Sequence, residues 1–235
     1  MDARPVVNIL TRTSGRPKYF EKCIESIRNQ SYSNINHLIS VDDDASEEYV
    51  KKYTNNYIRV EKYTGKILKV PSGRRPAPYN LYLNDLRDQV KEGWIMFLDD
   101  DDAFLEDNAI EEIINQLNNE DDLALWKVKF PERIIPGNLL FNKRMIALNH
   151  FSMIGFMYNK KYDDEAKFDY YSGGDFFFIS QLAPKIPNSV WIDKIYTGIQ
   201  RNDSMGGFGR KDDLGKENPK KQNPKNQKPR NTREN

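Results

Sequence analysis

The sequence predicts an α/β fold in which helices cover both faces of a mostly parallel central sheet. Short runs rich in β-branched residues alternate with segments of helical periodicity over roughly the first hundred residues. Acidic or polar residues directly follow three of these runs. Such alternation favours parallel strands joined by crossover helices, and ligands of open sheets of this kind bind beyond the carboxyl ends of the strands.

The first elements alternate regularly between strand and helix. A strand is expected over Val6–Leu10, and the following TRTSGRP has the composition of a turn. Pro17 opens a helix whose apolar residues recur with a period near 3.6. The run HLISV, His37–Val41, predicts a second strand, Ser46 starts a short helix, and Tyr57–Val60 predicts a third strand.

The alternation continues after a loop at GRRPAP. Leucines and other apolar residues indicate a helix over Pro78–Val90, and Trp94–Leu98 predicts a buried strand. Asp107 is expected to cap the next helix, which has isoleucines on one face. Leu123–Phe130 predicts a further strand, and the apolar segment after it is expected to supply the remaining strands.

The chain is expected to form a single domain followed by a tail. We place the domain at residues 3–210, with a ligand-binding half at 3–102 and a second half at 103–210. Residues 211–235 are almost entirely polar, with Leu214 as the one aliphatic residue. Such a segment buries too little apolar surface to offset the entropy lost on ordering, so we predict a disordered tail.

Composition excludes several classes of protein. The 36 basic and 35 acidic residues leave a net charge of +1, which argues against nucleic acid as a partner. The single cysteine, Cys23, rules out a disulfide framework and a cysteine-based zinc site. No run approaches the roughly 18 apolar residues of a membrane span, and the first residues lack the apolar core of a secretory signal. We therefore expect a cytoplasmic protein without a transmembrane segment.

Polar residues at three strand ends form the candidate site. Thr11-Arg12-Thr13 follows the first strand, Asp42-Asp43-Asp44 the second, and Asp99 to Asp102 the fourth. A single acidic run is most often a solvated surface. Three runs at the carboxyl ends of neighbouring parallel strands are expected to converge on one ligand site.

The aspartate quartet is suited to a hard divalent cation. Mg²⁺ is usually held by one or two carboxylates together with substrate phosphates. A calcium loop starting at Asp99 would need glycine and glutamate where Phe104 and Ile110 stand, and the register from Asp42 fails as well. The chain has no GxxxxGK[ST] and no GxGxxG after its first strand, so a bound diphosphate would rely on a metal rather than on a glycine loop.

These stretches resemble the family 2-type glycosyltransferases of the GT-A fold, a Rossmann-like architecture. VVNILTRTSGRPKYFEKCIESIRNQSYSNINHLISVDDDASEE is similar to the opening strand, helix and second strand of that family. WIMFLDDDDAF resembles its FLDxDD element, which contains the D-x-D metal motif. The likeness covers roughly residues 5 to 130 in order and implies metal-dependent transfer from a nucleotide-sugar.

The resemblance also implies roles for individual residues. Asp101, with Asp99, would ligate Mn²⁺ or Mg²⁺, which would bridge the donor diphosphate. Many relatives have a histidine near the metal or diphosphate in the segment that Gln200, Arg201 and Asn202 occupy here, and the resemblance implies that Arg201 or Arg210 contacts phosphate in its place. The residues implied to contact the donor are Thr11, Arg12, Asp42, Asp44, Arg74, Asn80, Asp99, Asp100 and Arg201.

Asp175 in YYSGGDFFFISQL has two interpretations. Gly173-Gly174 would make a turn, and Asp175 would simply cap the following helix. The resemblance instead implies that Asp175 is the general base of an inverting transfer, removing the proton of the acceptor hydroxyl. Gly174 departs from the pattern, because many relatives have glutamate there.

The expected function is a glycosyltransferase reaction with a nucleotide-sugar donor, most simply a UDP-sugar. The acceptor would be a glycan, a glycoprotein or a lipid-linked molecule. One alternative is a nucleotidyltransferase, for which TRTSGRP is a poor phosphate loop. Another is a catalytically silent module that binds a nucleotide or a carbohydrate.

Overall fold

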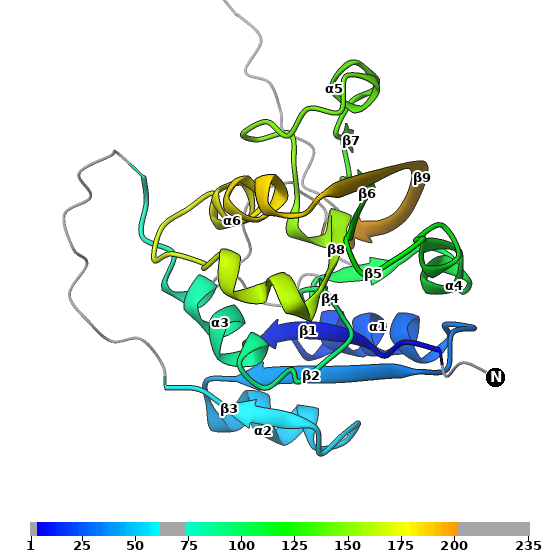
Figure 1. Cartoon of the computed structure of the whole chain (residues 1–235). Coiled ribbons are helices and arrows are strands. Elements are labelled where there is room, and N and C mark those ends of the chain that lie inside the picture. Colours follow the sequence, from blue (N-terminus) through cyan, green and yellow to red (C-terminus); the bar gives the residue numbers. More distant parts are fainter. Residues whose placement is uncertain (1–3, 62–73, 202–235) are drawn as a thin grey trace, which may run out of the picture.

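A single nine-stranded sheet organises the protein in the computed structural model, which describes residues 4–61 and 74–201. The main order is β3-β2-β1-β4-β8-β6-β9-β5, and β7 pairs with β6. Figure 1 shows the N-terminal half below in blue and cyan and the second half above in green to orange. The predicted α/β class is therefore confirmed.

The N-terminal half is a parallel sheet with crossover helices. Its strands pair as β3-β2-β1-β4, all parallel. The strands of this half are β1 (Val7–Thr13), β2 (Ile35–Val41), β3 (Tyr57–Arg59) and β4 (Trp94–Phe97). The helices of this half are α1 (Pro17–Arg28), α2 (Asp44–Val50) and α3 (Leu81–Arg87), the last preceded by the 3₁₀ turn Pro78–Asn80.

The second half extends the sheet with mixed pairing. β8 joins antiparallel to β4 and to β6, whereas β6 and β9 run parallel and β5 closes the edge antiparallel to β9. The strands of this half are β5 (Asp102–Phe104), β6 (Asp122–Lys129), β7 (Ile134–Ile135), β8 (Phe156–Asn159) and β9 (Asn188–Ile199). The helices are α4 (Ala109–Ile114), α5 (Asn138–Asn142) and α6 (Gly174–Leu182), with 3₁₀ segments at Met153–Gly155, Lys160–Glu165 and Ala183–Lys185.

The core lies on both sides of the sheet. Helix α1 buries Tyr19, Phe20, Cys23, Ile24 and Ile27, the face that its sequence periodicity predicts. β4 is buried along its whole length, as expected for a central strand covered on both faces. Gly93, which precedes β4, has a φ of +86°, and a Cβ there would lie 2.3 Å from the Val6 carbonyl oxygen. Only glycine fits this entry into the strand.

Three element predictions need correction. β1 continues to Thr13 rather than ending at Leu10, because its hydrogen bonds with β2 persist to the pair of Thr13 and Val41. The helix predicted over Pro78–Val90 is a 3₁₀ turn followed by a shorter α-helix ending at Arg87. The cap of α4 is Asn108 rather than Asp107, and its side chain makes no capping bond.

Some predictions fall outside the described residues. The tail at 211–235, the end of the domain at residue 210 and Arg210 itself belong to this group, and the division of the domain at residue 102 stays a prediction. None of the described helices has the length and apolar character needed to span a bilayer.

Candidate functional site

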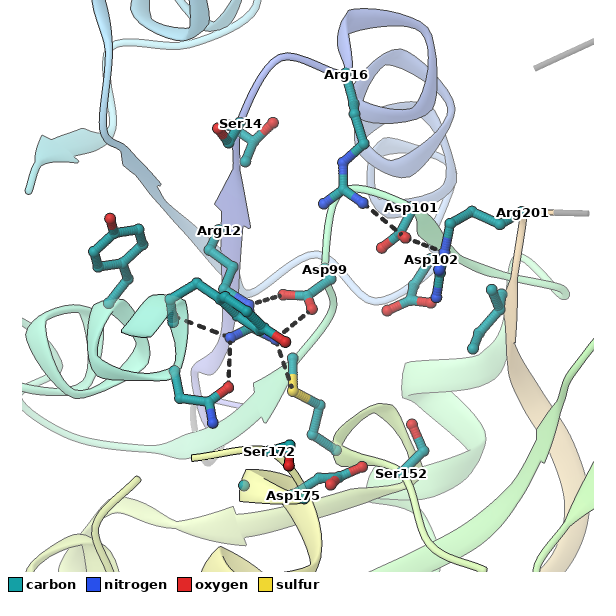
Figure 2. A pocket seen from close by; sticks show the side chains of 18 of the residues that line it. Arg12, Ser14, Arg16, Asp99, Asp101, Asp102, Ser152, Ser172, Asp175 and Arg201 are labelled. Carbon is teal, nitrogen blue, oxygen red and sulfur yellow. Dashed lines mark hydrogen bonds and ion pairs between the residues drawn. The ribbon is translucent and has the colours of Figure 1, made fainter. Parts of the chain in front are cut away.

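A cavity of about 360 Å³ opens where the carboxyl ends of β1 and β4 face the start of α6. One side, the strand-end wall, consists of Arg12, Arg16, Asp99, Asp101, Asp102 and Arg201. The opposite side, the helix wall, consists of Ser172, Gly173, Gly174 and Asp175. Figure 2 shows the two walls facing each other. The cavity is thus located where open α/β sheets bind ligands.

The strand-end wall gathers three carboxylates. Asp99 and Asp101 leave β4 toward the cavity, while the intervening Asp100 points into the protein and is fully buried. A tight turn, in which the Asp102 backbone N–H donates to the Asp99 carbonyl at 2.9 Å, brings Asp102 back beside them. One oxygen from each of Asp99, Asp101 and Asp102 lies within 4.8 Å of the others.

Arg12 fixes the first of these carboxylates. Its Nε and Nη2 donate to the two oxygens of Asp99 at 2.8 and 2.7 Å, the bidentate geometry that makes arginine–carboxylate pairs strong. Its Nη1 also donates to the Asn80 side-chain oxygen at 3.1 Å, and the guanidinium lies over the ring of Tyr79. The predicted residues Arg12, Asn80 and Asp99 therefore form one network at the cavity.

Two further arginines bind the rest of the quartet. Arg16 donates to Asp101 at 2.9 Å through Nη1 and to Asp100 at 3.1 Å through Nε, and its Nη2 forms an ion pair with Asp100. Arg201, which follows β9, forms an ion pair with the same oxygen of Asp101. Asp101 is therefore held between two guanidinium groups.

Burial disfavours the charged form of two aspartates of the quartet, Asp100 and Asp102, despite these arginines. Burial raises the pKa of Asp100 to about 7, against the opposing charge of Arg16. Burial and the neighbouring charges of Asp101 and Asp99 raise the pKa of Asp102 well above its ordinary value. A cluster of hard oxygen ligands with too little positive charge fits a divalent cation such as Mg²⁺ or Mn²⁺. Asp99, Asp101 and Asp102 are the residues that could hold it.

The helix wall presents one carboxylate in a different setting. Asp175 lies in the first turn of α6 and accepts from the Phe176 backbone N–H at 3.0 Å. Among residues 4–61 and 74–201 it forms no ion pair, and burial raises its pKa. The N-cap is Gly173, in the left-handed region at φ +78°, so Asp175 does not cap the helix. A half-buried carboxylate with a raised pKa is suited to accept a proton.

Gly174 packs on the strand-end network. A Cβ at this position would lie 2.5 Å from Asn80 Nδ2. The same amide nitrogen donates to the Tyr171 carbonyl at 2.8 Å, and the amide oxygen accepts from Arg12. Asn80 therefore links the two walls, and glycine at 174 leaves room for it.

Two residues predicted to contact the donor are buried behind the cavity. Thr11 is fully buried within β1, where its hydroxyl donates to the Leu98 carbonyl at 2.6 Å. Asp100 points inward, because successive side chains of an extended segment alternate. Both predictions of a donor contact disagree with these positions.

Three more predicted residues lie away from the cavity. Asp44 has a side chain that is 93% exposed and forms an ion pair with Arg59. Arg74 forms a bidentate pair with Asp169, at 2.6 and 3.0 Å, and packs on Phe177 instead of lining the site. Asp42 is buried and reaches the cavity only through Tyr82, whose hydroxyl donates to it at 3.3 Å.

Sequence reasoning placed Asp102 in the acidic quartet without a ligand role and did not single out Arg16. Asp102 received no ligand role because a D-x-D motif takes alternate residues, whereas the tight turn after β4 folds the fourth aspartate back. Arg16 lies in the GRP segment that the composition indicated only as a turn. The spacing of TRTSGRP from the quartet gave no signal that Arg16 would reach two of its aspartates.

Comparison with family models decides the family. The model described as "Glycosyl transferase family 2" matches residues 9–178, which include the strand-end wall except Arg201 and all of the helix wall. The chain belongs to glycosyl transferase family 2. The predicted resemblance to this family is confirmed. No curated protein matches the chain.

Solved structures show that this member of the family has the predicted GT-A fold. It is similar to S. aureus TarS 1-349 in complex with UDP-GlcNAc, with 19% identity and a TM-score of 0.63 over 85% of this chain and 60% of that chain. It is also similar to the mannosyltransferase PcManGT from Pyrobaculum calidifontis in complex with GDP-Man and Mn²⁺, with 13% identity and a TM-score of 0.60 over 84% and 57%. The chain thus spans less than two thirds of the length of either solved chain.

Proposed function

We propose that this glycosyltransferase moves a sugar from a nucleoside-diphosphate sugar to an acceptor hydroxyl, using a divalent cation and inverting the anomeric centre. The observation that carries the proposal is the pairing of two kinds of carboxylate across one cavity. The strand-end wall holds a cluster suited to a cation, and the helix wall holds Asp175. Structures of TarS with UDP-GlcNAc and of PcManGT with GDP-Man and Mn²⁺ support a donor of this class.

Asp99, Asp101 and Asp102 are the proposed ligands of the cation. When bound, the cation supplies positive charge that stabilises the departing nucleoside diphosphate. Arg12 keeps Asp99 in place through its bidentate pair and through Asn80. Arg201, at the same end of the cavity, is the proposed second cationic contact for the diphosphate.

Asp175 is the proposed general base. Its carboxylate would take the proton of the acceptor hydroxyl as the oxygen bonds to the anomeric carbon and the bond from that carbon to the diphosphate oxygen breaks. Its raised pKa makes it a better proton acceptor than a fully solvated aspartate. Attack from the wall opposite the diphosphate would invert the anomeric centre without a covalent intermediate.

The proposal also includes the chemical class of the donor and of the acceptor. We propose a UDP-sugar as the donor and a glycan, glycoprotein or lipid-linked molecule as the acceptor. A silent binding module would bind the donor without turnover, so release of the nucleoside diphosphate by the wild type separates the two functions.

A thermal-shift panel tests the proposed donor class. The unfolding temperature of the protein is measured with UDP-, GDP- and dTDP-sugars, each with and without Mn²⁺. We expect one nucleotide to stabilise the protein only when Mn²⁺ is present, because binding to the folded state alone raises stability. A protein that responds to no nucleotide with Mn²⁺ would contradict the proposed function.

A further inference from the structure

Arg201 lies against the oxygen atoms that a cation would need. Its Nε forms an ion pair with Asp101 Oδ2, and its side chain also lies beside Asp102 (Figure 2). Asp101 and Asp102 are two of the three carboxylates whose oxygens cluster within 4.8 Å. An arginine and a divalent cation would therefore compete for the same negative charge.

Arg16 differs from Arg201 in how it is anchored. It makes two contacts to the buried Asp100, with Nε at 3.1 Å and Nη2 in an ion pair, in addition to its bond with Asp101. The Thr13 hydroxyl donates to Asp100 at 2.7 Å and holds that carboxylate in turn. We therefore expect Arg16 to keep its position when a cation binds, because moving it away would leave Asp100 buried without a counter-charge.

We propose that Arg201 occupies the cation position of the aspartate cluster in the free enzyme and exchanges onto the donor diphosphate when the metal binds. This inference rests on the proposed function. A cation arriving alone must displace Arg201 from Asp101, which costs the ion pair between them. A nucleoside diphosphate arriving with the cation offsets this cost, because arginine binds phosphate oxygens as it binds carboxylates.

The exchange makes metal and nucleotide binding mutually dependent. The diphosphate binds the arginine that the cation displaces, and the cation occupies the aspartates that the arginine leaves. The cation and the nucleotide should therefore raise each other's affinity by the same factor. Coupling of this kind typically amounts to about 5- to 150-fold in affinity. Removing the arginine should change the two affinities in opposite directions, which a merely structural role for Arg201 would not do.

The test measures Mn²⁺ binding to the full chain by the EPR signal of free Mn²⁺, and UDP, GDP and dTDP binding by calorimetry with and without Mn²⁺. For Arg201→Gln we expect Mn²⁺ alone to bind about 5- to 10-fold more tightly than to the wild type, at the lower end of typical coupling. The nucleotide should bind more weakly in the presence of Mn²⁺. The factor by which the two ligands strengthen each other should fall toward one.

Two further variants make the result specific. Arg201→Met keeps the length of the buried stem without the charge and should behave as Arg201→Gln does, which covers the case in which the glutamine variant does not fold. Arg201→Lys keeps the charge and should stay nearer to the wild type. Arg59→Gln, which removes an arginine paired with Asp44 outside the cavity, is the matched control and should leave Mn²⁺ binding unchanged.

Two different failures are distinguishable. If the wild type shows coupled binding of Mn²⁺ and a nucleotide but neutral variants at position 201 bind Mn²⁺ alone no more tightly, the exchange is wrong and the proposed function stands. If the wild type binds no nucleotide with Mn²⁺, both the exchange and the proposed function are wrong.

Discussion

The carboxylates on the two walls of the cavity have different kinds of partner. On the strand-end wall, Asp99 and Asp101 are each paired with arginine, and the pairs come from different elements of the chain. On the helix wall, Asp175 has only a backbone N–H as its hydrogen-bond partner among the described residues. The first arrangement places carboxylates beside arginines at a candidate cation site, and in the second, burial raises the pKa of a carboxylate so that it can accept a proton.

The comparison teaches that residues of one type acquire different chemistry from their surroundings. Arg12 holds Asp99 through two hydrogen bonds, which fix the orientation of this carboxylate. Burial disfavours the charged form of Asp175 and raises its pKa. Variants of each wall should therefore separate binding from turnover.

The largest effect is expected from Asp175→Asn. An amide cannot accept the proton of the acceptor hydroxyl, so turnover should fall by about 10²- to 10⁴-fold, the usual contribution of a general base. Donor binding with Mn²⁺ should stay near that of the wild type. The measurement is release of the nucleoside diphosphate, with the exposed Asp164→Asn as the control. Turnover that is unchanged in Asp175→Asn would contradict the assignment of the base.

The pH dependence of turnover should report the same group. Because the pKa of Asp175 is raised from its ordinary 3.8, its base form is lost as the pH falls through this raised value. As the pH is lowered, kcat/KM should therefore begin to fall at a higher pH than it would with a solvated aspartate as the base. Below that pH, kcat/KM should fall about tenfold per pH unit, and this fall is the acid limb of the profile. Asp175→Asn should remove this limb from its residual activity. If the acid limb persists in the variant, a group other than Asp175 causes it.

Asp101→Asn tests the strand-end wall. The amide keeps a contact for Arg16 but ligates a cation poorly, so the metal-dependent part of nucleotide binding should disappear. At a donor concentration near 100 times the dissociation constant, this removes about 2.7 kcal/mol of ligand-induced stability. Thermal shifts with and without Mn²⁺ measure it. An unchanged metal response would exclude Asp101 as a ligand.

The sequence predicted the strand-end wall better than the helix wall, and the reason is physical. The parallel half is built from local β-α-β units, and its strands and helices follow directly from hydrophobic periodicity. The structure accordingly places Asp99 and Asp101, which follow β4, at the cavity. The pairing of β6 with β8 and β9 joins residues far apart in the chain, which no local pattern encodes.

The errors in the candidate site have the same origin. Thr11 was expected at the cavity because β1 was predicted three residues too short, and its extra pairs with β2 bury that residue. Asp102 received no ligand role because its position depends on a tight turn rather than on strand alternation. Asp175 was found only through the family resemblance, since its own surroundings are made by distant segments.

Gly174→Ala tests the contact between the two walls. The added Cβ would meet Asn80 Nδ2 at 2.5 Å and force the amide to shift. Such overpacking typically costs about 1–3 kcal/mol of unfolding free energy. Denaturant unfolding measures the loss, and Gly137→Ala, where a Cβ would meet nothing within 4 Å, is the matched control. Equal stability of the two variants would show that the Asn80 side chain can shift at little cost in unfolding free energy.

The smallest effect is expected from Asp44→Asn. Its side chain is 93% exposed and pairs with Arg59 at the surface, so its removal should change the unfolding free energy by less than about 0.5 kcal/mol. Nucleotide binding with Mn²⁺ should be unchanged, measured by the same thermal shift. A clear loss of nucleotide affinity would place Asp44 in the donor site after all and would correct the limits of the cavity.

The most direct test of the account is the anomalous diffraction signal of Mn²⁺ in crystals of the protein grown with UDP. We predict one strong peak at the strand-end wall, about 2.0–2.2 Å from carboxylate oxygens of at least two of Asp99, Asp101 and Asp102, with a diphosphate oxygen as a further ligand. A strong peak elsewhere, or a bound UDP whose diphosphate has no metal beside it, would contradict the account.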